Sequence, residues 1–219
     1  MKSTSPIFLI TTPESDPVVF YLSKWSEEVI EEAQNKGFNV VNLPREKASL
    51  AEFEGHMAKM KPCFVMLNGH GSPSKIAGHK NGIILEKGRN EKVTKGAIVY
   101  ARSCFALKEL GEACVSSGAK GFVSYSFPFM FVSDPNRSAH PMKDELAAPC
   151  RITSNMIPVS IIKGQSISEA VMKAKDRMDE LIGFWETRRD LPEASIVASC
   201  LYWNKLGLGL RGEADTRIA

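Results

Sequence analysis

Short apolar runs alternate with amphipathic stretches along the first half of the chain. Five runs of strand length lie at residues 7–11, 38–43, 63–67, 97–102 and 121–126. Between them, apolar residues recur at helical spacing in residues 18–35, 50–60 and 107–117. Strands that alternate with helices pair in parallel and carry helices on both faces. We therefore predict an α/β fold, a three-layer α/β/α sandwich around a mostly parallel central sheet.

The remaining segments are less regular. Residues 127–149 contain several prolines and little periodicity, so we predict a long loop that borders the functional site. Further predicted elements are a small hairpin at 78–85, a strand at 158–162, a helix at 168–188, a helix from Pro192 and a final strand at 206–210. No repeat, low-complexity tract or linker interrupts the pattern. Residues 1–219 are therefore expected to form one domain.

Composition and charge narrow the classes of partner. Hydrophobic residues make up 43% of the 219 residues, which is enough for a sizeable core. The formal net charge is only +3, with basic and acidic residues interleaved, so no nucleic-acid partner is expected. No apolar stretch is long enough for a membrane span, and the run at 7–11 is too short for the core of a signal peptide. We expect no membrane partner and a cytoplasmic location.

The five cysteines lack the close pairing that a zinc site needs, so no metal centre is predicted. We interpret four of them as reduced structural residues: Cys63, Cys114, Cys150 and Cys200. Cys104 differs, because it follows directly on the predicted strand at 97–102. It is the cysteine for which a chemical role is predicted.

Two segments each end an apolar run at one chemically capable residue. Residues 64–72 read Phe-Val-Met-Leu-Asn-Gly-His-Gly-Ser and present His70 between glycines, whereas residues 97–106 present Cys104. Because ligands gather beyond the carboxyl ends of parallel strands, both residues are expected in one cleft. A Cys–His pair is typical of nucleophilic catalysis.

The surroundings of these two residues suit acyl transfer. A helix predicted to begin almost at once after Cys104 would place its sulfur near a helix N-terminus, which favours the thiolate. Gly71 lacks a Cβ, so a substrate carbonyl can approach its main chain closely. We expect the amides of Gly71 and Cys104 to form an oxyanion hole.

The order of the two residues points to a family. His70 precedes Cys104 by 34 positions, as in caspases, whereas papain-like proteases have the cysteine first. Residues 65–72 and 98–104 resemble the strand–His–Gly–Ser/Thr and strand–Cys motifs of the caspase-like superfamily (clan CD), which includes caspases, metacaspases, legumains, separases, gingipains and CHAT-domain proteins. Residues 118–125 resemble the strand that follows in gingipain-like and CHAT members. The tail at 201–217 resembles the gingipain-like ending, but has Gly-Glu-Ala in place of Gly-Asp-Pro.

The resemblance implies a caspase-like fold and a cysteine peptidase that acts on a protein or peptide substrate. Cys104 would be the nucleophile and His70 the proton donor to the departing amine, with a thioester intermediate. No third catalytic residue is nominated, and His56, His79 and His140 are expected to have no catalytic role. No cofactor is expected, and the sequence does not indicate calcium activation. A regulatory protein partner is left open.

Substrate selectivity is expected to depend on Arg102, because side chains two apart on a strand face the same way. In related families this position contributes to the substrate pocket, and metacaspases carry aspartate there. The arginine here predicts either a preference for an acidic or polar side chain or an ion pair with Glu14 or Asp134. The remaining candidate substrate-binding residues follow the first and fifth strands or lie in the long loop: Thr12, Glu14, Ser126, Phe127 and Asp134.

Three other classes of protein are alternatives to a peptidase. A catalytically silent caspase-like module of the CHAT type, acting in protein–protein interaction or signalling, would retain the fold without turnover. A flavodoxin-like binding domain is disfavoured because the first strand–helix junction, residues 11–17, is acidic and free of glycine, unlike a phosphate-binding loop. A glutaminase of the Cys–His type would have the cysteine first.

Overall fold

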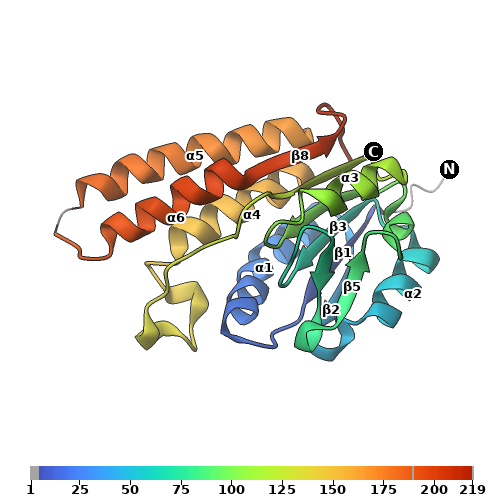
Figure 1. Ribbon diagram of the computed structural model, residues 1–219, viewed down its shortest axis with the longest axis horizontal. Helices are drawn as coiled ribbons and strands as arrows, with labels where there is room; N and C mark the ends of the chain where they lie inside the picture. Colours follow the sequence, from blue (N-terminus) through green and yellow to red (C-terminus); the bar gives the residue numbers. More distant parts are fainter. Residues whose placement is uncertain (1–4, 189, 219) are drawn as a thin grey trace.

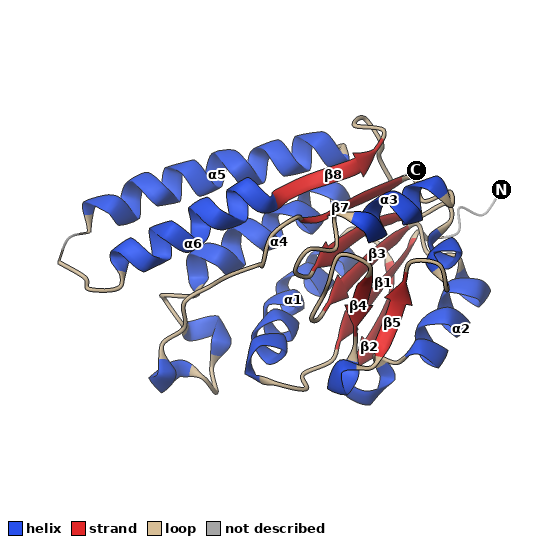
Figure 2. Ribbon diagram, viewed as in Figure 1, coloured by secondary structure: helices blue, strands red, loops and turns tan. Residues whose placement is uncertain are grey.

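A computed structural model describes residues 5–188 and 190–218 and shows a twisted six-stranded sheet (Figures 1 and 2). The strands lie in the order β2-β1-β3-β6-β7-β8, and only β8 runs antiparallel to its neighbour. Their bounds are β1 Ile7–Thr12, β2 Asn39–Pro44, β3 Phe64–Asn68, β6 Ile98–Arg102, β7 Gly121–Tyr125 and β8 Leu208–Gly212. The predicted mostly parallel sheet is confirmed.

Helices cover both faces of the sheet (Figure 1). One face packs against α1 Pro17–Asn35, α4 Ala148–Ile162, α5 Ile167–Thr187 and α6 Ala194–Gly207. The other packs against α2 Leu50–Met60, α3 Glu109–Ser116 and the predicted hairpin, formed by β4 Lys75–Ala77 and β5 Ile83–Glu86. The layers arise because successive strand residues point to opposite faces of the sheet. Each strand therefore contributes side chains to the hydrophobic cores on both faces. Within the described ranges, no helix is both long and apolar enough to cross a bilayer.

Short 3₁₀ turns complete the structure at Arg45–Lys47, His79–Asn81, Glu91–Thr94, Pro135–Arg137 and Pro141–Lys143. The last two lie within the predicted long loop, which extends from the end of β7 to the start of α4. The loop is therefore irregular over most of its length, as its composition predicted.

The strand predicted at 158–162 is wrong, because these residues form the last turns of α4. Pro158 lies inside that helix and has no N–H to donate to the carbonyl of Ser154, four residues earlier. The phenolic hydroxyl of Tyr100 on β6 donates to this carbonyl at 3.1 Å. A contact from the sheet therefore replaces the hydrogen bond that proline removes, which the local sequence could not reveal.

The long loop is fastened to the body of the protein by one carboxylate. Asp144 is 1% exposed and accepts hydrogen bonds from the hydroxyl of Tyr21 on α1, at 2.8 Å, and from three loop amides, those of Asp134, Leu146 and Ala147. Burial and the adjacent carboxylate raise the pKa of Tyr21, which therefore stays a donor. The loop thus depends on a buried charge that four donors compensate.

We expect Asp144→Ala to lower the free energy of unfolding by about 3 kcal/mol, because it leaves buried donors without an acceptor. Urea denaturation of both proteins measures the difference. Asp179→Ala is the matched control, since Asp179 forms an exposed ion pair with Lys205, a kind worth less than about 1 kcal/mol. Equal losses in the two variants would contradict the anchoring role of Asp144.

Candidate active site

The strands β1, β3 and β6 are parallel neighbours, so their carboxyl ends lie at one edge of the sheet. From β1 the strand order proceeds to β2 on one side and to β3 on the other, so this edge holds the topological switch point of the sheet. Asp16 follows β1, His70 follows β3 and Cys104 follows β6. The fold therefore brings the two motif segments to neighbouring strand ends, where a crevice is expected in an open α/β sheet.

The segment of His70 packs directly on the segment of Cys104. A Cβ at Gly71 would lie 2.5 Å from the carbonyl oxygen of Cys104 and 2.9 Å from the Cβ of Ser103. The hydroxyl of Ser103 donates to the carbonyl of Gly69 at 2.7 Å. Only glycine permits this approach, because any larger residue at position 71 would overlap the backbone of the cysteine segment.

Gly69 has a second steric requirement. Its φ is +154°, and a Cβ there would lie 2.0 Å from the carbonyl oxygen of Ala77 on β4. The amide of Ala77 in turn donates to the carbonyl of His70 at 2.9 Å. The two glycines that flank the histidine therefore let its backbone sit between the hairpin and the cysteine segment.

His70 has a partner that the sequence analysis did not nominate. Its Nε2 lies 2.9 Å from Oδ2 of Asp16, and the histidine side chain is 46% exposed. The other oxygen of Asp16 accepts the amide of Val19 at 3.0 Å and so caps α1. An Asp followed by Pro is a visible helix-start signal in the sequence. Its second contact, 54 positions away, depends on the tertiary fold.

Cys104 is half-buried, and its thiol is free. Burial raises the pKa of this thiol, against the opposing effect of hydrogen bonds from the backbone amides of Phe129 and of Cys104 itself. The helix predicted to begin at about residue 107 begins at Glu109, and Lys108 is its N-cap. The expected helix N-terminus therefore does not reach the sulfur, and the resting cysteine is a thiol.

The turn between Cys104 and α3 has a strained start. Phe105 has φ of +62°, in the left-handed region that a residue with a side chain seldom adopts. Its amide donates to the carbonyl of Phe127 at 3.3 Å. Strain of this kind costs roughly 1–3 kcal/mol and tends to occur at functional sites. Here it turns the chain sharply immediately after the thiol.

The two amides predicted for the oxyanion hole are those of Gly71 and Cys104. Gly71 is paired with Ile76 of β4 in a bridge whose hydrogen bonds come from the neighbouring residues. In residues 5–188 and 190–218, neither the N–H of Gly71 nor that of Cys104 donates to a main-chain carbonyl. A developing oxyanion needs two N–H donors that no main-chain carbonyl occupies.

The predicted substrate-binding residues at the end of β1 already have partners. The hydroxyl of Thr12 donates to the side-chain oxygen of Asn42 at 2.9 Å. The carboxylate of Glu14 forms ion pairs with Lys24 at 3.3 Å and Arg45 at 2.9 Å, which lower its pKa against the effect of burial. These side chains therefore shape the β1–α1 junction.

The predicted substrate-binding residues beyond β7 also have partners within the protein. The hydroxyl of Ser126 donates to the carbonyl of Gly207, and the ring of Phe127 lies 4.9 Å from that of Trp203 on α6. Asp134 accepts hydrogen bonds from the backbone and side chain of Asn136. Ser126 and Phe127 thus connect the end of β7 to α6, while Asp134 caps a turn of the loop.

Arg102 is fully buried, with 0% exposure. Its Nη2 donates to the side chain of Asn155 on α4 at 2.9 Å, and its guanidinium lies 5.8 Å from the centre of the Trp25 ring. The ion pairs predicted for Arg102 are not formed, because Glu14 pairs with other cations and Asp134 with Asn136. Arg102 therefore has no exposed surface in this structure, contrary to the expectation that it lines a substrate pocket.

Comparison with known proteins finds a likeness of structure. No protein-family model and no curated protein matches the sequence. Gingipain R (RGPB), an Arg-specific cysteine proteinase, superposes with a TM-score of 0.58 and 10% identity, over 97% of this chain and 47% of its own. The separase–securin complex of Saccharomyces cerevisiae superposes with a TM-score of 0.55 and 14% identity, over 95% of this chain and 12% of that chain. The chain has the caspase-like fold.

At these identities the likeness establishes the fold alone. The caspase-like chain spans less than half of the gingipain, at 47%, and an eighth of the matched chain in the separase complex, at 12%. The caspase-like architecture predicted from the His70 and Cys104 motifs is confirmed.

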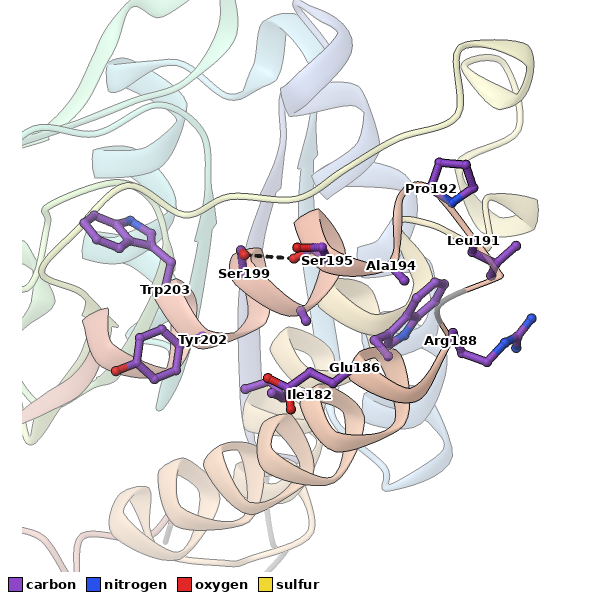
Figure 3. Close-up of a pocket in the computed structure, with 12 residues that line it drawn as sticks. Ile182, Glu186, Arg188, Leu191, Pro192, Ala194, Ser195, Ser199, Tyr202 and Trp203 are labelled. Carbon is purple, nitrogen blue, oxygen red and sulfur yellow. Dashed lines mark hydrogen bonds between the residues drawn. The ribbon is translucent and has the colours of Figure 1, made fainter.

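Two cavities of the caspase-like chain differ in their relation to the site. One of about 470 Å³ lies beside the histidine and is lined by residues of the His70 segment and the β4–β5 hairpin, among them Lys75, Asn81 and Ile83. Another, of about 850 Å³, lies between α5 and α6. Figure 3 shows Trp203 and Tyr202 at one end of it and Leu191 and Pro192 at the other. None of the predicted site residues lines this larger cavity.

Proposed function

We propose that the chain is a cysteine endopeptidase in which His70 and Cys104 form the catalytic dyad. The observation that carries the proposal is the packing of Gly71 on the backbone of Cys104, with a virtual Cβ only 2.5 Å from the Cys104 carbonyl oxygen. This contact brings the backbone of the His70 segment against the backbone of the Cys104 segment at the switch point of the sheet. Acyl transfer needs a nucleophile, a general base and oxyanion donors in one place, and this packing supports such an arrangement.

The proposed reaction proceeds through a thioester. The thiol of Cys104 loses its proton to the imidazole of His70, and the sulfur attacks the peptide carbonyl carbon. The resulting oxyanion accepts hydrogen bonds from the N–H groups of Gly71 and Cys104. The carbon–nitrogen bond then breaks as His70 returns the proton to the leaving amine. A water molecule attacks the thioester, which releases the carboxylic acid and restores the thiol.

Asp16 is proposed as a positioning residue for the histidine. A carboxylate only accepts hydrogen bonds, so the 2.9 Å contact requires a proton on Nε2 of His70 and leaves Nδ1 for the transfer. The negative charge also stabilises the imidazolium that forms during the reaction. The α1 cap holds Asp16 in turn, so the contact is preorganised.

We expect Asp16→Asn to lower kcat by about tenfold to a hundredfold with little change in KM, because the orientation and charge of the His70 environment matter in the transition state. The free energy of unfolding should change little, since asparagine also caps helices well. Steady-state kinetics and urea denaturation measure the two effects. A rise in KM with unchanged kcat would contradict a positioning role.

Labelling with a set of peptidyl acyloxymethyl ketones tests the proposed function, with mass spectrometry to locate the modified residue. We expect modification of Cys104 that is lost in Cys104→Ala and strongly slowed in His70→Ala. Cys63→Ala is the matched control, because Cys63 is likewise a half-buried free thiol, at the start of β3. Labelling of Cys63 in preference to Cys104 would contradict the assignment.

One observation favours the silent caspase-like module as a second candidate. The thiol of Cys104 is half-buried, and burial raises its pKa. A chain that needs only the fold would tolerate such a thiol. Absence of labelling at Cys104 by every peptidyl probe, with rapid labelling of the unfolded chain by iodoacetamide, would favour this candidate over the peptidase.

A further inference from the structure

The β4–β5 hairpin forms one wall of the cavity beside His70. This cavity, of about 470 Å³, is lined by residues 70–72 of the histidine segment and by Lys75, Ala77, Asn81 and Ile83 of the hairpin. Of the residues that the structure describes, none from the segments that follow β6 and β7 lines it. The cavity therefore lies on the histidine side of the site, away from the loop beyond β7.

The base of the hairpin is joined to the histidine segment by main-chain hydrogen bonds. The amide of Ala77 donates to the carbonyl of His70 at 2.9 Å, and the amide of Ser72 donates to the carbonyl of Lys75 at 2.9 Å. These two bonds flank the bridge between Gly71 and β4, so residues 70–72 pair with the hairpin as a short third strand. The wall of the cavity and the backbone of His70 therefore form one unit.

The tip of the hairpin is also held in place. The amide of His79 donates to the carbonyl of Ala48 at 2.9 Å, and its ring Nδ1 donates to the carbonyl of Pro13 at 3.0 Å. A Cβ at Gly78 would lie only 2.1 Å from the Ala48 carbonyl oxygen, so the tip packs directly on the start of α2. Because the hairpin is fixed at both ends, the cavity is preformed.

Two adjacent residues at the tip have strained backbones. Lys80 has φ of +48° and Asn81 has φ of +61°, both in the left-handed region. Asparagine tolerates this region, but lysine does so less readily. Strain of this kind persists only where the surrounding structure imposes it, and it is common where a protein holds a ligand. Here the strained turn places Asn81 in the lining of the cavity.

The lining of the cavity has no unpaired charge among the described residues. His70 contacts the carboxylate of Asp16 at 2.9 Å, and Lys75 forms an ion pair with Glu86 across the hairpin at 3.0 Å. The other lining residues are uncharged, and Ala77 and Ile83 supply apolar surface. An ionised ligand would lose water there without gaining a free partner of opposite charge, which costs free energy. An aliphatic group would instead be stabilised by burial.

We propose that this cavity binds the side chain of the residue after the scissile bond and selects an uncharged aliphatic one, such as leucine, isoleucine or methionine. The inference rests on the proposed peptidase function, in which His70 returns its proton to the leaving amine. The residue that carries this amine therefore lies on the histidine side, where the cavity is. Its volume is within the range of about 300–1,000 Å³ that is usual for ligand sites.

Peptide binding to the full chain with Cys104→Ala tests the inference without turnover. The ligands are Leu-Ala-Ala amide and its Lys and Asp counterparts, whose free amino terminus represents the segment that leaves after cleavage. Nuclear magnetic resonance titration measures their affinities, with the methyl signals of Ala77 and Ile83 as reporters of the cavity. We expect the Leu peptide to bind at least fivefold more tightly than either charged peptide and to shift both signals.

A single charge added to the wall should change this selectivity. Asn81→Asp keeps a residue that tolerates the left-handed region, so the fold should be retained. It should raise the affinity for the Lys peptide at least fivefold and change that for the Leu peptide little. The matched control is Asn39→Asp, which adds the same charge at the exposed first residue of β2, at the opposite end of the parallel strands. It should leave all three affinities unchanged.

The inference and the proposed function can fail separately. Equal affinities for the three peptides, a preference for a charged one, no binding, or binding that leaves both methyl signals unmoved would overturn the inference. Hydrolysis of a peptide library by the unsubstituted chain, without enrichment of aliphatic residues after the cleaved bond, would overturn it and leave the peptidase standing. Preferential binding of the Leu peptide at the cavity, without hydrolysis or labelling of Cys104, would support the aliphatic pocket and overturn the peptidase.

Discussion

Replacing Cys104 by alanine is expected to abolish peptide hydrolysis, with a loss of at least about 10³-fold in kcat. The sulfur forms the bond that the thioester mechanism requires. The fold should survive, because the side chain is only half-buried and its removal costs about 1 kcal/mol. Hydrolysis of a fluorogenic peptide pool and urea denaturation measure the two effects.

Two controls make this result specific. Cys63→Ala removes a half-buried thiol at the opposite end of the parallel strands and should leave hydrolysis unchanged. Cys104→Ser keeps a nucleophilic atom of similar placement and should also be nearly inactive, because an alcohol is far less acidic than a thiol. Hydrolysis that persists in Cys104→Ala at the original rate would show that the nucleophile lies elsewhere.

The sequence predicted the layers of the fold because burial imposes them locally. Runs such as Phe64–Asn68 and Ile98–Arg102 are buried on both faces, so they appear as continuous apolar segments. The order of strands and helices then restricts the topology, since parallel strands need crossover helices. The strand predicted at residues 158–162 was wrong for the opposite reason, as Pro158 shows. Its place in α4 depends on a hydroxyl from Tyr100, 58 positions away, and not on its neighbours.

Part of the candidate site could likewise be predicted from the sequence. Motif and strand order brought His70, Gly71 and Cys104 to one edge, because each follows a strand directly. The sequence does not mark Asp16 as part of the site, because its role as the N-cap of α1 already explains an aspartate at this position. Strand alternation predicted that Arg102 faces a substrate pocket, but it could not show that the side chain is buried against Trp25 and Asn155. It also could not indicate the position of residues 127–132, which depends on aromatic packing against α1 and on Asn204.

Gly71→Ala is expected to lower kcat by about 10²–10³-fold, the loss usual when an oxyanion donor is displaced. The added Cβ would lie 2.5 Å from the Cys104 carbonyl oxygen and 2.9 Å from the Ser103 Cβ, so the two segments must separate. That movement shifts both proposed donors, the amides of residues 71 and 104, with one methyl group. Overpacking of this kind costs about 1–3 kcal/mol of stability. Steady-state kinetics, with urea denaturation in parallel, measure both.

The matched control is Gly183→Ala on α5, where an added Cβ meets nothing within 4 Å. It should leave kcat unchanged and stabilise the helix by up to about 1 kcal/mol. A structural effect alone would reduce the fraction of folded Gly71→Ala protein, and hence its rate, without altering kcat per folded molecule. The oxyanion assignment requires that kcat falls in protein shown to be folded. A folded Gly71→Ala variant with the original kcat would exclude this amide from the reaction and would also show that the close approach of the two segments serves packing alone.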